Sequence, residues 1–155
     1  MSPLSQQLWE MACEAPPAKA AKSCNDWPKL TLEECQAKMG SVGAWDLLSS
    51  ESDGVLKLER SFIALNFQSA LDFVAAAGAV AEQRNHHPDL HITGYRNVRI
   101  VVYSHGLSGL TENDFLLCEA IDASAKIKYS PKFIKENPRC AYTSAVAEGS
   151  ASSSS

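Results

Sequence analysis

The sequence predicts an α+β fold: a four-stranded antiparallel sheet built from two hairpins, with three helices packed on one face. Two pairs of segments alternate between polar and apolar residues, and a short turn joins the members of each pair, which is the pattern of a β-hairpin. Three segments with helical spacing of apolar residues precede, separate and follow these pairs. The predicted order is therefore α-β-β-α-β-β-α, in which the helices can cover one face of the antiparallel sheet.

The first helix and the first hairpin are predicted from capping and turn signals. Thr31 and Glu34 have the spacing of a capping box, which predicts a helix over about residues 32–40. An Asp-Gly turn signal separates a short strand at 45–50 from an alternating strand at 55–65. One side of the longer strand is apolar and the other carries charged and hydroxyl side chains, so we expect this strand to be half-buried.

A long helix is predicted to begin after Asn66, which can cap its first turn. It should end near residues 85–87, because Pro88 disfavours helical geometry in the residue before it. Apolar side chains at helical spacing form a stripe that is expected to face the core. This stripe consists of Phe67, Leu71, Phe73, Val74, Val80 and Ala81. The aromatic residues expected in the core are Trp45, Phe62, Phe67, Phe73 and Phe115.

The second hairpin and a last helix complete the predicted domain. A strand at 89–93 pairs with a strand at 98–105 across a short turn. A helix is predicted after Thr111, with Asp114 at its third position as the other half of a capping box. This helix should continue to about residue 127, which gives the third helix of the fold.

The 155 residues suggest a single domain with an extension at each end. Residues 1–28 mix proline, alanine and lysine and are predicted to be mostly irregular. The folded domain is expected over residues 29–137, with the chain leaving helical structure at Pro131. Residues 138–155 are rich in serine and alanine and have too little apolar surface to offset the entropy of ordering, so this tail is predicted to be disordered.

Composition and charge argue against several classes of partner. The net charge of −4 and the pI of about 5.5 argue against a binder of nucleic acids and against a basic membrane contact. The longest apolar run, residues 74–81, is far shorter than a membrane helix. The five cysteines are odd in number and include no CxxC pair, which favours a reducing compartment. We therefore expect a cytoplasmic protein, or an organellar one if a presequence has been removed.

Three of the four histidines lie in NHHPDLH, residues 85–91, and His105 follows on the next predicted strand. Metal binding is one interpretation, because His87 and His91 have the spacing of a HExxH zinc site, although Pro88 and a predicted strand interrupt any helix there. Capping of a helix end is a second interpretation. Acid–base catalysis is a third, because imidazole titrates near neutral pH and adjacent histidines disfavour double protonation.

The spacing of the polar residues resembles that of the pterin-4a-carbinolamine dehydratases. The pattern is Glu82, three residues, His86-His87-Pro88, six residues, Tyr95, nine residues, His105, eight residues and Asp114. The stretches GAWDL, LERSF, HHPDLH and GLTENDF are similar to that family as well, so the resemblance spans about residues 31–125. It implies the same order of helices and strands that the hydrophobic pattern predicts.

The resemblance implies a hydro-lyase that converts 4a-hydroxytetrahydropterin into quinonoid dihydropterin and water, in tetrahydrobiopterin recycling. A general acid protonates the hydroxyl that leaves C4a and a general base takes the proton from N5, so neither a cofactor nor a metal is implied. The implied catalytic residues are His86, His87 and His105, with His86 and His105 as acid and base and His87 as a pterin ligand. The implied substrate-binding residues are these three with Asn85, Pro88, Tyr103 and Ser104. Glu82 and Asp114 are implied supporting residues, and Asp114 is equally explained as a helix cap.

The resemblance also implies a homodimer or homotetramer, because an exposed edge strand can pair with its twin. Some members of the family act in other ways: one is a dimerisation partner of a homeodomain transcription factor, and others assist Rubisco assembly. A non-catalytic partner or assembly role is therefore the main alternative to the enzyme, and a metal-dependent hydrolase is a third reading. The presence of all three histidines of the motif favours the enzyme. The expected ligand is a small pterin, with no direct contact to nucleic acid or membrane.

Overall fold

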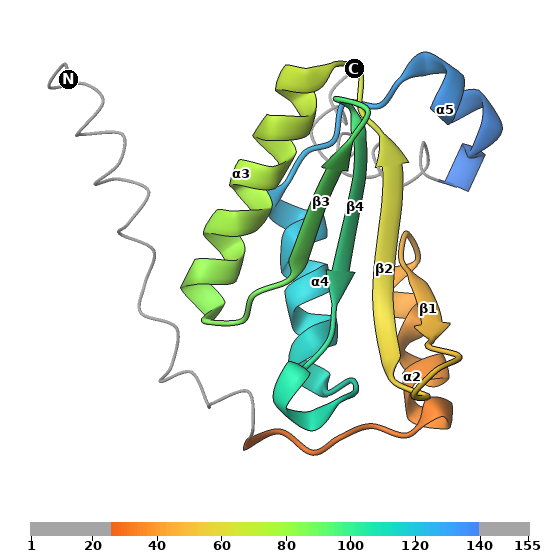
Figure 1. Cartoon of the computed structure of the whole chain (residues 1–155), viewed down its shortest axis with the longest axis vertical. Coiled ribbons are helices and arrows are strands. Elements are labelled where there is room, and N and C mark those ends of the chain that lie inside the picture. The colour runs from red at the N-terminus through yellow and green to blue at the C-terminus, as the bar shows by residue number, and fades with distance from the viewer. Residues whose placement is uncertain (1–25, 140–155) are drawn as a thin grey trace, which may run out of the picture.

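The computed structural model describes residues 26–139, which form one sheet with helices packed against it (Figure 1). Most of the extension predicted at 1–28 and nearly all of the tail predicted at 138–155 lie outside the described residues. The elements in chain order are α2 (Leu32–Lys38), the 3₁₀ helix η2 (Met39–Val42), β1 (Asp46–Ser49), β2 (Leu56–Ile63), α3 (Phe67–Arg84), β3 (Asp89–Thr93), β4 (Asn97–Val102), the 3₁₀ helix η3 (His105–Leu107), α4 (Glu112–Ser124) and α5 (Pro131–Glu136).

The four strands form one antiparallel sheet in the order β1-β2-β4-β3. Both hairpins pair as the sequence predicts, and they join through β2 and β4. Leu58 lies opposite Val102 and Phe62 lies opposite Val98, so even-numbered side chains of these two strands point to the same face. The predicted α+β fold with a four-stranded antiparallel sheet is confirmed.

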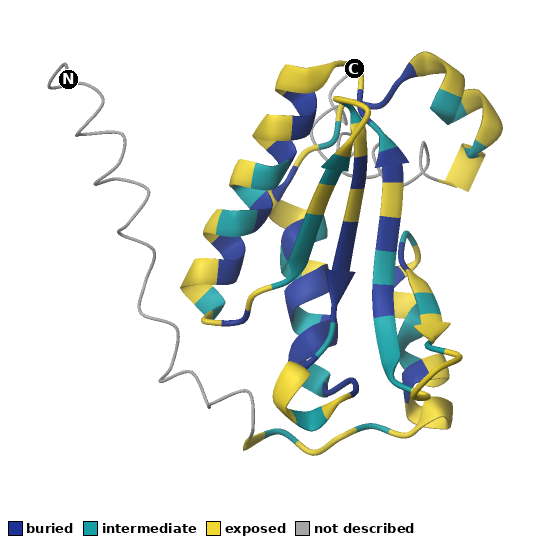
Figure 2. Ribbon diagram, viewed as in Figure 1, coloured by how far each residue is buried: buried dark blue, intermediate teal, exposed yellow. Residues whose placement is uncertain are grey.

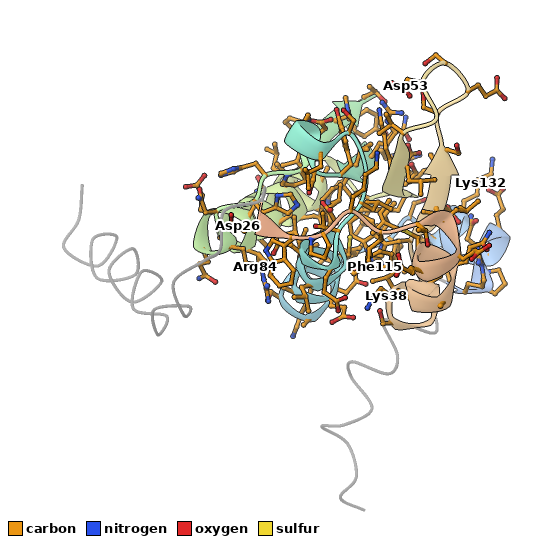
Figure 3. All side chains as sticks on the ribbon, turned by 90° about the horizontal axis from the view of Figure 1, so that it is seen from below. Asp26, Lys38, Asp53, Arg84, Phe115 and Lys132 are labelled. Carbon is orange, nitrogen blue, oxygen red and sulfur yellow. The ribbon has the colours of Figure 1, made fainter. Side chains whose placement is uncertain are left out.

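Helices α2, α3 and α4 cover the face to which these apolar side chains point (Figure 1). Buried residues of the sheet and of the helices meet there in one core, while the outer sides of the helices are exposed (Figure 2). Phe62 of β2 packs edge-on against Phe73 of α3, with 4.8 Å between the ring centroids. In the view from below, side chains fill the middle of the fold around Phe115, and Asp53 and Lys132 project at its rim (Figure 3).

The capping residues predicted at the starts of α2 and α3 cap these helices in the structure. Thr31 and Glu34 form a capping box at the start of α2, and Asn66 caps α3 by accepting a hydrogen bond from a backbone N–H of its first turn. At the other end of α3, Asn85 has a left-handed conformation with φ of 49°, and its backbone N–H bonds to carbonyls of the last turn. Asn85 therefore ends the helix itself, because asparagine tolerates positive φ better than most residues do.

The predicted core stripe of α3 is partly wrong. Phe67 and Leu71 are 49% and 39% exposed, so Phe67 is not one of the core aromatic residues. The buried residues of α3 are Ser69, Ala70, Phe73, Ala77, Val80 and Ala81. Apolar side chains extend around much of this helix, so their spacing alone did not identify the side that faces the sheet.

Three predicted boundaries also differ from the structure. The last predicted helix, α4, ends at Ser124 and not near residue 127. The chain does not leave helical structure at Pro131: this proline is the first residue of α5, a position where its missing N–H costs nothing. β4 ends at Val102, so His105 begins η3 and does not lie in a strand. Among residues 26–139, no helix is long and apolar enough to cross a membrane.

A buried polar cluster ties the segment after α4 to the sheet. Arg60 of β2 forms an ion pair with Asp122 of α4 and donates a 2.7 Å hydrogen bond to the hydroxyl of Tyr129. The indole N–H of Trp45 also donates to Asp122. Burial raises the pKa of Asp122, although the Arg60 charge acts in the opposite direction. The backbone of Tyr129 also forms an isolated antiparallel β-bridge with that of Ala64. The cluster and this bridge together fix the start of α5 beside the end of β2.

Candidate active site

The predicted site residues belong to segments that meet at one end of the sheet, toward the lower end of Figure 1. Helix α3 ends there and β3 begins there, with His86 and His87 between them. β4 also ends there, and η3, whose first residue is His105, leads into the start of α4. The antiparallel topology therefore brings together two loops that are separated by a full hairpin in the sequence.

His86 points into the protein. The left-handed Asn85 turns the chain back, and the backbone N–H of His86 donates to the carbonyl of Ala81, 3.1 Å away. The side chain of His86 is consequently buried, with the residue only 4% exposed. Its Nε2 lies 2.6 Å from Oδ1 of Asp114, at the start of α4.

Asp114 is fully buried, and its carboxylate is surrounded by donors. Its Oδ2 accepts hydrogen bonds from the backbone N–H of Thr111 at 2.8 Å, the hydroxyl of Thr111 at 3.0 Å and the hydroxyl of Ser104 at 2.9 Å. These bonds replace the water that a buried carboxylate loses. Because the carboxylate accepts, the proton of His86 belongs on Nε2, which fixes the tautomer and the ring orientation. Asp114 thus both caps α4 and holds His86.

His87 points outward, in contrast to its neighbour. Its side chain is 56% exposed, and its Nε2 lies 2.6 Å from Oε1 of Glu82. Glu82, which the resemblance implies as a supporting residue, therefore pairs with the exposed His87. The Glu82 side chain is itself 78% exposed, so solvent screens this contact.

His105 is also half-exposed, and two side chains contact it. Its Nε2 lies 3.6 Å from Oδ1 of Asp89, and its ring lies 4.0 Å from the ring of Tyr103, centroid to centroid. The ammonium group of Lys57 lies 4.5 Å from the centroid of the same Tyr103 ring, which is the geometry of a cation–π contact. Sequence reasoning did not identify Lys57 or Asp89, because the pairing register of β2 with β4, which brings Lys57 to Tyr103, is not visible in the sequence.

The two loops are connected at two points. The hydroxyl of Ser104, the residue before His105, bonds to the carboxylate that holds His86. Asp89, the residue after Pro88, contacts His105. His91, by contrast, lies within β3 and lines a separate hollow of about 390 Å³ that no predicted site residue lines. Among the described residues, no group of three or more histidine, cysteine or acidic side chains is arranged to hold a metal ion.

The fold and the site together define a class: an α+β protein with one four-stranded sheet and a cluster of histidines and carboxylates at one end of it. A sequence profile described as pterin 4 alpha carbinolamine dehydratase matches residues 28–124, more than half of the chain. The chain therefore belongs to the pterin 4 alpha carbinolamine dehydratase family. This result confirms the resemblance seen in the sequence.

Individual relatives agree with the family assignment. Pterin-4-alpha-carbinolamine dehydratase 2, mitochondrial, from Arabidopsis thaliana is 39% identical over 106 residues, which cover 67% of this chain and 56% of that relative. A protein of Nitrosococcus oceani, named provisionally for the same activity, is 34% identical over 121 residues, or 78% of this chain and 98% of that protein. The chain thus spans little more than half of the Arabidopsis relative and almost all of the bacterial one.

A solved structure has the same fold. A Brucella melitensis protein, described as a transcriptional coactivator/pterin dehydratase, matches with a TM-score of 0.55 and 28% sequence identity. The match covers 64% of this chain and all of that chain. The family profile ends at residue 124, so α5 lies beyond the part of the chain that the profile matches.

Proposed function

We propose that this protein removes water from a 4a-hydroxytetrahydropterin and yields the quinonoid dihydropterin, a step of tetrahydrobiopterin recycling. The observation that carries the proposal is the placement of three histidines on two loops at the same end of the sheet, with His86 held by Asp114 and with His87 and His105 exposed. Family membership supports the same class of reaction. The overall step is loss of hydroxide from C4a and loss of a proton from N5, which forms the C4a=N5 double bond.

Proton transfer is the task that we assign to His86 and His105. One imidazolium protonates the leaving hydroxyl, and the other imidazole takes the N5 proton. Asp114 suits His86 to such a role, because the carboxylate orients the ring and stabilises the imidazolium that forms when the ring accepts a proton. His105 is exposed to an incoming ligand, and its ring lies beside the carboxylate of Asp89 and the ring of Tyr103.

Binding and orientation of the pterin fall to the neighbouring residues. His87 offers an exposed ring beside the carboxylate of Glu82 and is proposed to bind the pterin and help polarise its hydroxyl. Asn85 and Pro88 shape the loop that carries both histidines, and Tyr103 contributes a partly buried aromatic ring. The Ser104 hydroxyl already bonds to Asp114, so we propose that Ser104 positions this carboxylate and does not bind the pterin through its side chain.

The direct test is to generate the 4a-hydroxypterin and follow its decay by ultraviolet absorbance. The wild-type protein should accelerate the decay, and His86→Ala and His105→Ala should each lower the rate by roughly 10²–10⁴-fold. His91→Ala is the matched control, because it removes an exposed histidine of the same short stretch that lies outside the cluster, and its rate should equal that of the wild type. Wild-type rates in both site variants would remove these two histidines from the mechanism.

Protein binding is a second candidate function, favoured by exposed apolar side chains at the start of α3. Leu65, Phe67 and Leu71 are 45%, 49% and 39% exposed, and such groups often mark contacts with another protein. We propose that they, or the edge of β3, join copies of this chain into a homodimer or homotetramer, and that a non-catalytic partner could use the same surface. The Brucella relative, described in part as a coactivator, supports this alternative.

Oligomerisation is tested by size-exclusion chromatography with light scattering. The wild type should elute as a multiple of 16.8 kDa, and Leu71→Ser should shift the mass toward the monomer. Leu32→Ser is the control, because Leu32 is 48% exposed on α2, away from this surface. A wild-type protein that is monomeric at every concentration contradicts the proposal.

The compartment of the protein is proposed to be the cytoplasm. The mitochondrial name of the Arabidopsis relative supports an organelle as the alternative. Fractionation of cells that express a tagged full-length chain distinguishes the two locations.

A further inference from the structure

The hollow on the open face of the sheet has the dimensions of a small-molecule site. Its volume is about 390 Å³, within the range of ligand pockets. Strand register places two rows of side chains in it, because residues that pair across β3, β4 and β2 point to the same face. One row consists of His91, Arg99 and Ser61, and the next row consists of Thr93, Asn97 and Ile63. Phe133 of α5 lines the hollow as well.

Arg99 occupies the middle of this site and has donors to offer. Its side chain is 51% exposed, and its ion pair with Glu59 is long, at 3.5 Å from one guanidinium nitrogen. Arginine has five N–H donors, so this contact leaves most of them available. Glu59 also accepts a hydrogen bond from Ser61, and it does not line the hollow. The lining thus contains an arginine and a histidine and no acidic residue.

The remaining side chains of the wall include two apolar ones. Ile63 and Phe133 lie beside the two basic side chains, whereas the side chains of Phe62 and Val98 are buried on the helix-covered face. Phe133 is held in place by stacking on Tyr129, with 5.8 Å between the ring centroids. A ligand that satisfies both parts of the site therefore has an anionic group at one end and a flat apolar body at the other.

We propose that this hollow binds a small aromatic carboxylate, with the carboxylate on Arg99 and His91 and the ring against Phe133 and Ile63. The planar guanidinium matches a carboxylate with two parallel hydrogen bonds, and the aromatic ring adds contact area on Phe133. The site does not depend on the proposed dehydratase reaction, because none of the catalytic histidines lines it. Phe133 belongs to α5, which follows the part of the chain matched by the family profile.

The test is a titration of the ¹⁵N-labelled full-length chain followed by amide chemical shifts. Benzoate should cause saturable shifts at Thr93, Asn97 and Arg99, with a millimolar dissociation constant because the site is open to solvent. Benzamide has the aromatic ring without the negative charge, and acetate has the carboxylate without the ring. Inorganic phosphate tests whether any anion binds. Each of these three should bind at least about tenfold more weakly than benzoate.

Variants locate the site. Arg99→Gln should weaken benzoate binding by about tenfold, and Phe133→Ala should weaken it to a smaller extent. Arg96→Gln is the matched control, because it removes one positive charge in the adjacent turn, where Arg96 lies over Tyr95 and outside the hollow. His86→Ala should bind benzoate as the wild type does, whatever its catalytic rate. The proposal is overturned if benzoate causes no saturable shift, if benzamide, acetate or phosphate binds equally well, or if Arg99→Gln retains wild-type affinity.

Discussion

Replacing Asp114 with asparagine should impair both folding and catalysis. The side chain keeps its shape, but one of its two acceptor oxygens becomes an amide donor. Oδ2 accepts three hydrogen bonds and Oδ1 meets only His86, so the amide nitrogen is expected at the Oδ1 position. There it faces Nε2 of His86 and forces the opposite tautomer, in which Nε2 accepts.

The size of the effect follows from burial. A hydrogen bond to a charged group contributes about 1.5–3 kcal/mol, and removal of one partner of a buried ion pair costs about 3–5 kcal/mol. Asparagine retains most of the bonds to Oδ2, so we expect a loss of about 2–4 kcal/mol in the free energy of unfolding. We also expect the dehydration rate to fall by about 10²-fold or more, because the ring is held in the wrong tautomer.

Urea unfolding followed by circular dichroism measures the first quantity, and the absorbance assay measures the second. Glu112→Gln is the matched control: it lies in the same first turn of α4, but its partly exposed side chain pairs with Lys38 near the surface. That variant should lose less than about 1 kcal/mol and keep its rate. If Asp114→Asn were as stable and as active as the control, the buried carboxylate would have no role in holding His86.

Three further predictions concern stability. Asn66→Ala removes the cap on the backbone N–H of Ser69 and should cost about 1 kcal/mol in urea unfolding. Burial raises the pKa of Asp122, so the ionised carboxylate lowers the free energy of unfolding at neutral pH, and this loss is recovered as the pH falls through the raised pKa. In urea unfolding measured at a series of pH values, Asp122→Asn should not show this gain in the free energy of unfolding at lower pH, whatever its absolute stability. Gly94→Ala should lower the melting temperature, because φ is +51° and the new Cβ would lie 2.8 Å from the side chain of Asn97; a melting temperature equal to that of the wild type would contradict this reasoning.

Local chemistry made most of the fold predictable. The capping signals at Thr31, Asn66 and Thr111 each precede a helix, and the alternating segments on either side of each turn pair as hairpins. The errors arose where burial depends on tertiary packing. Phe67 and Leu71 fit a helical stripe as well as Phe73 does, and only the position of the sheet decides which of them is covered.

The sequence spacing named candidate residues for the site but did not predict how they are arranged. The spacing pointed to His86, His87 and His105, but it could not show that the first is buried and the other two are exposed. That distinction depends on the left-handed backbone of Asn85 and on the carboxylate of Asp114, which lies 28 positions after His86 in the sequence. The contact of His105 with Asp89 could not be predicted from the sequence either, because it depends on how two loops approach each other in space.

The left-handed residue at the end of α3 has a consequence for how this sequence can change. Asn85 is the pivot that sends one imidazole inward and the next one outward, although the two side chains are chemically identical. Inserting one residue directly after Asn85 would move His86 away from the buried carboxylate, and deleting one residue before Pro88 would leave a single imidazole for the two positions. The loop should therefore accept many substitutions on its surface and yet tolerate no change in its length.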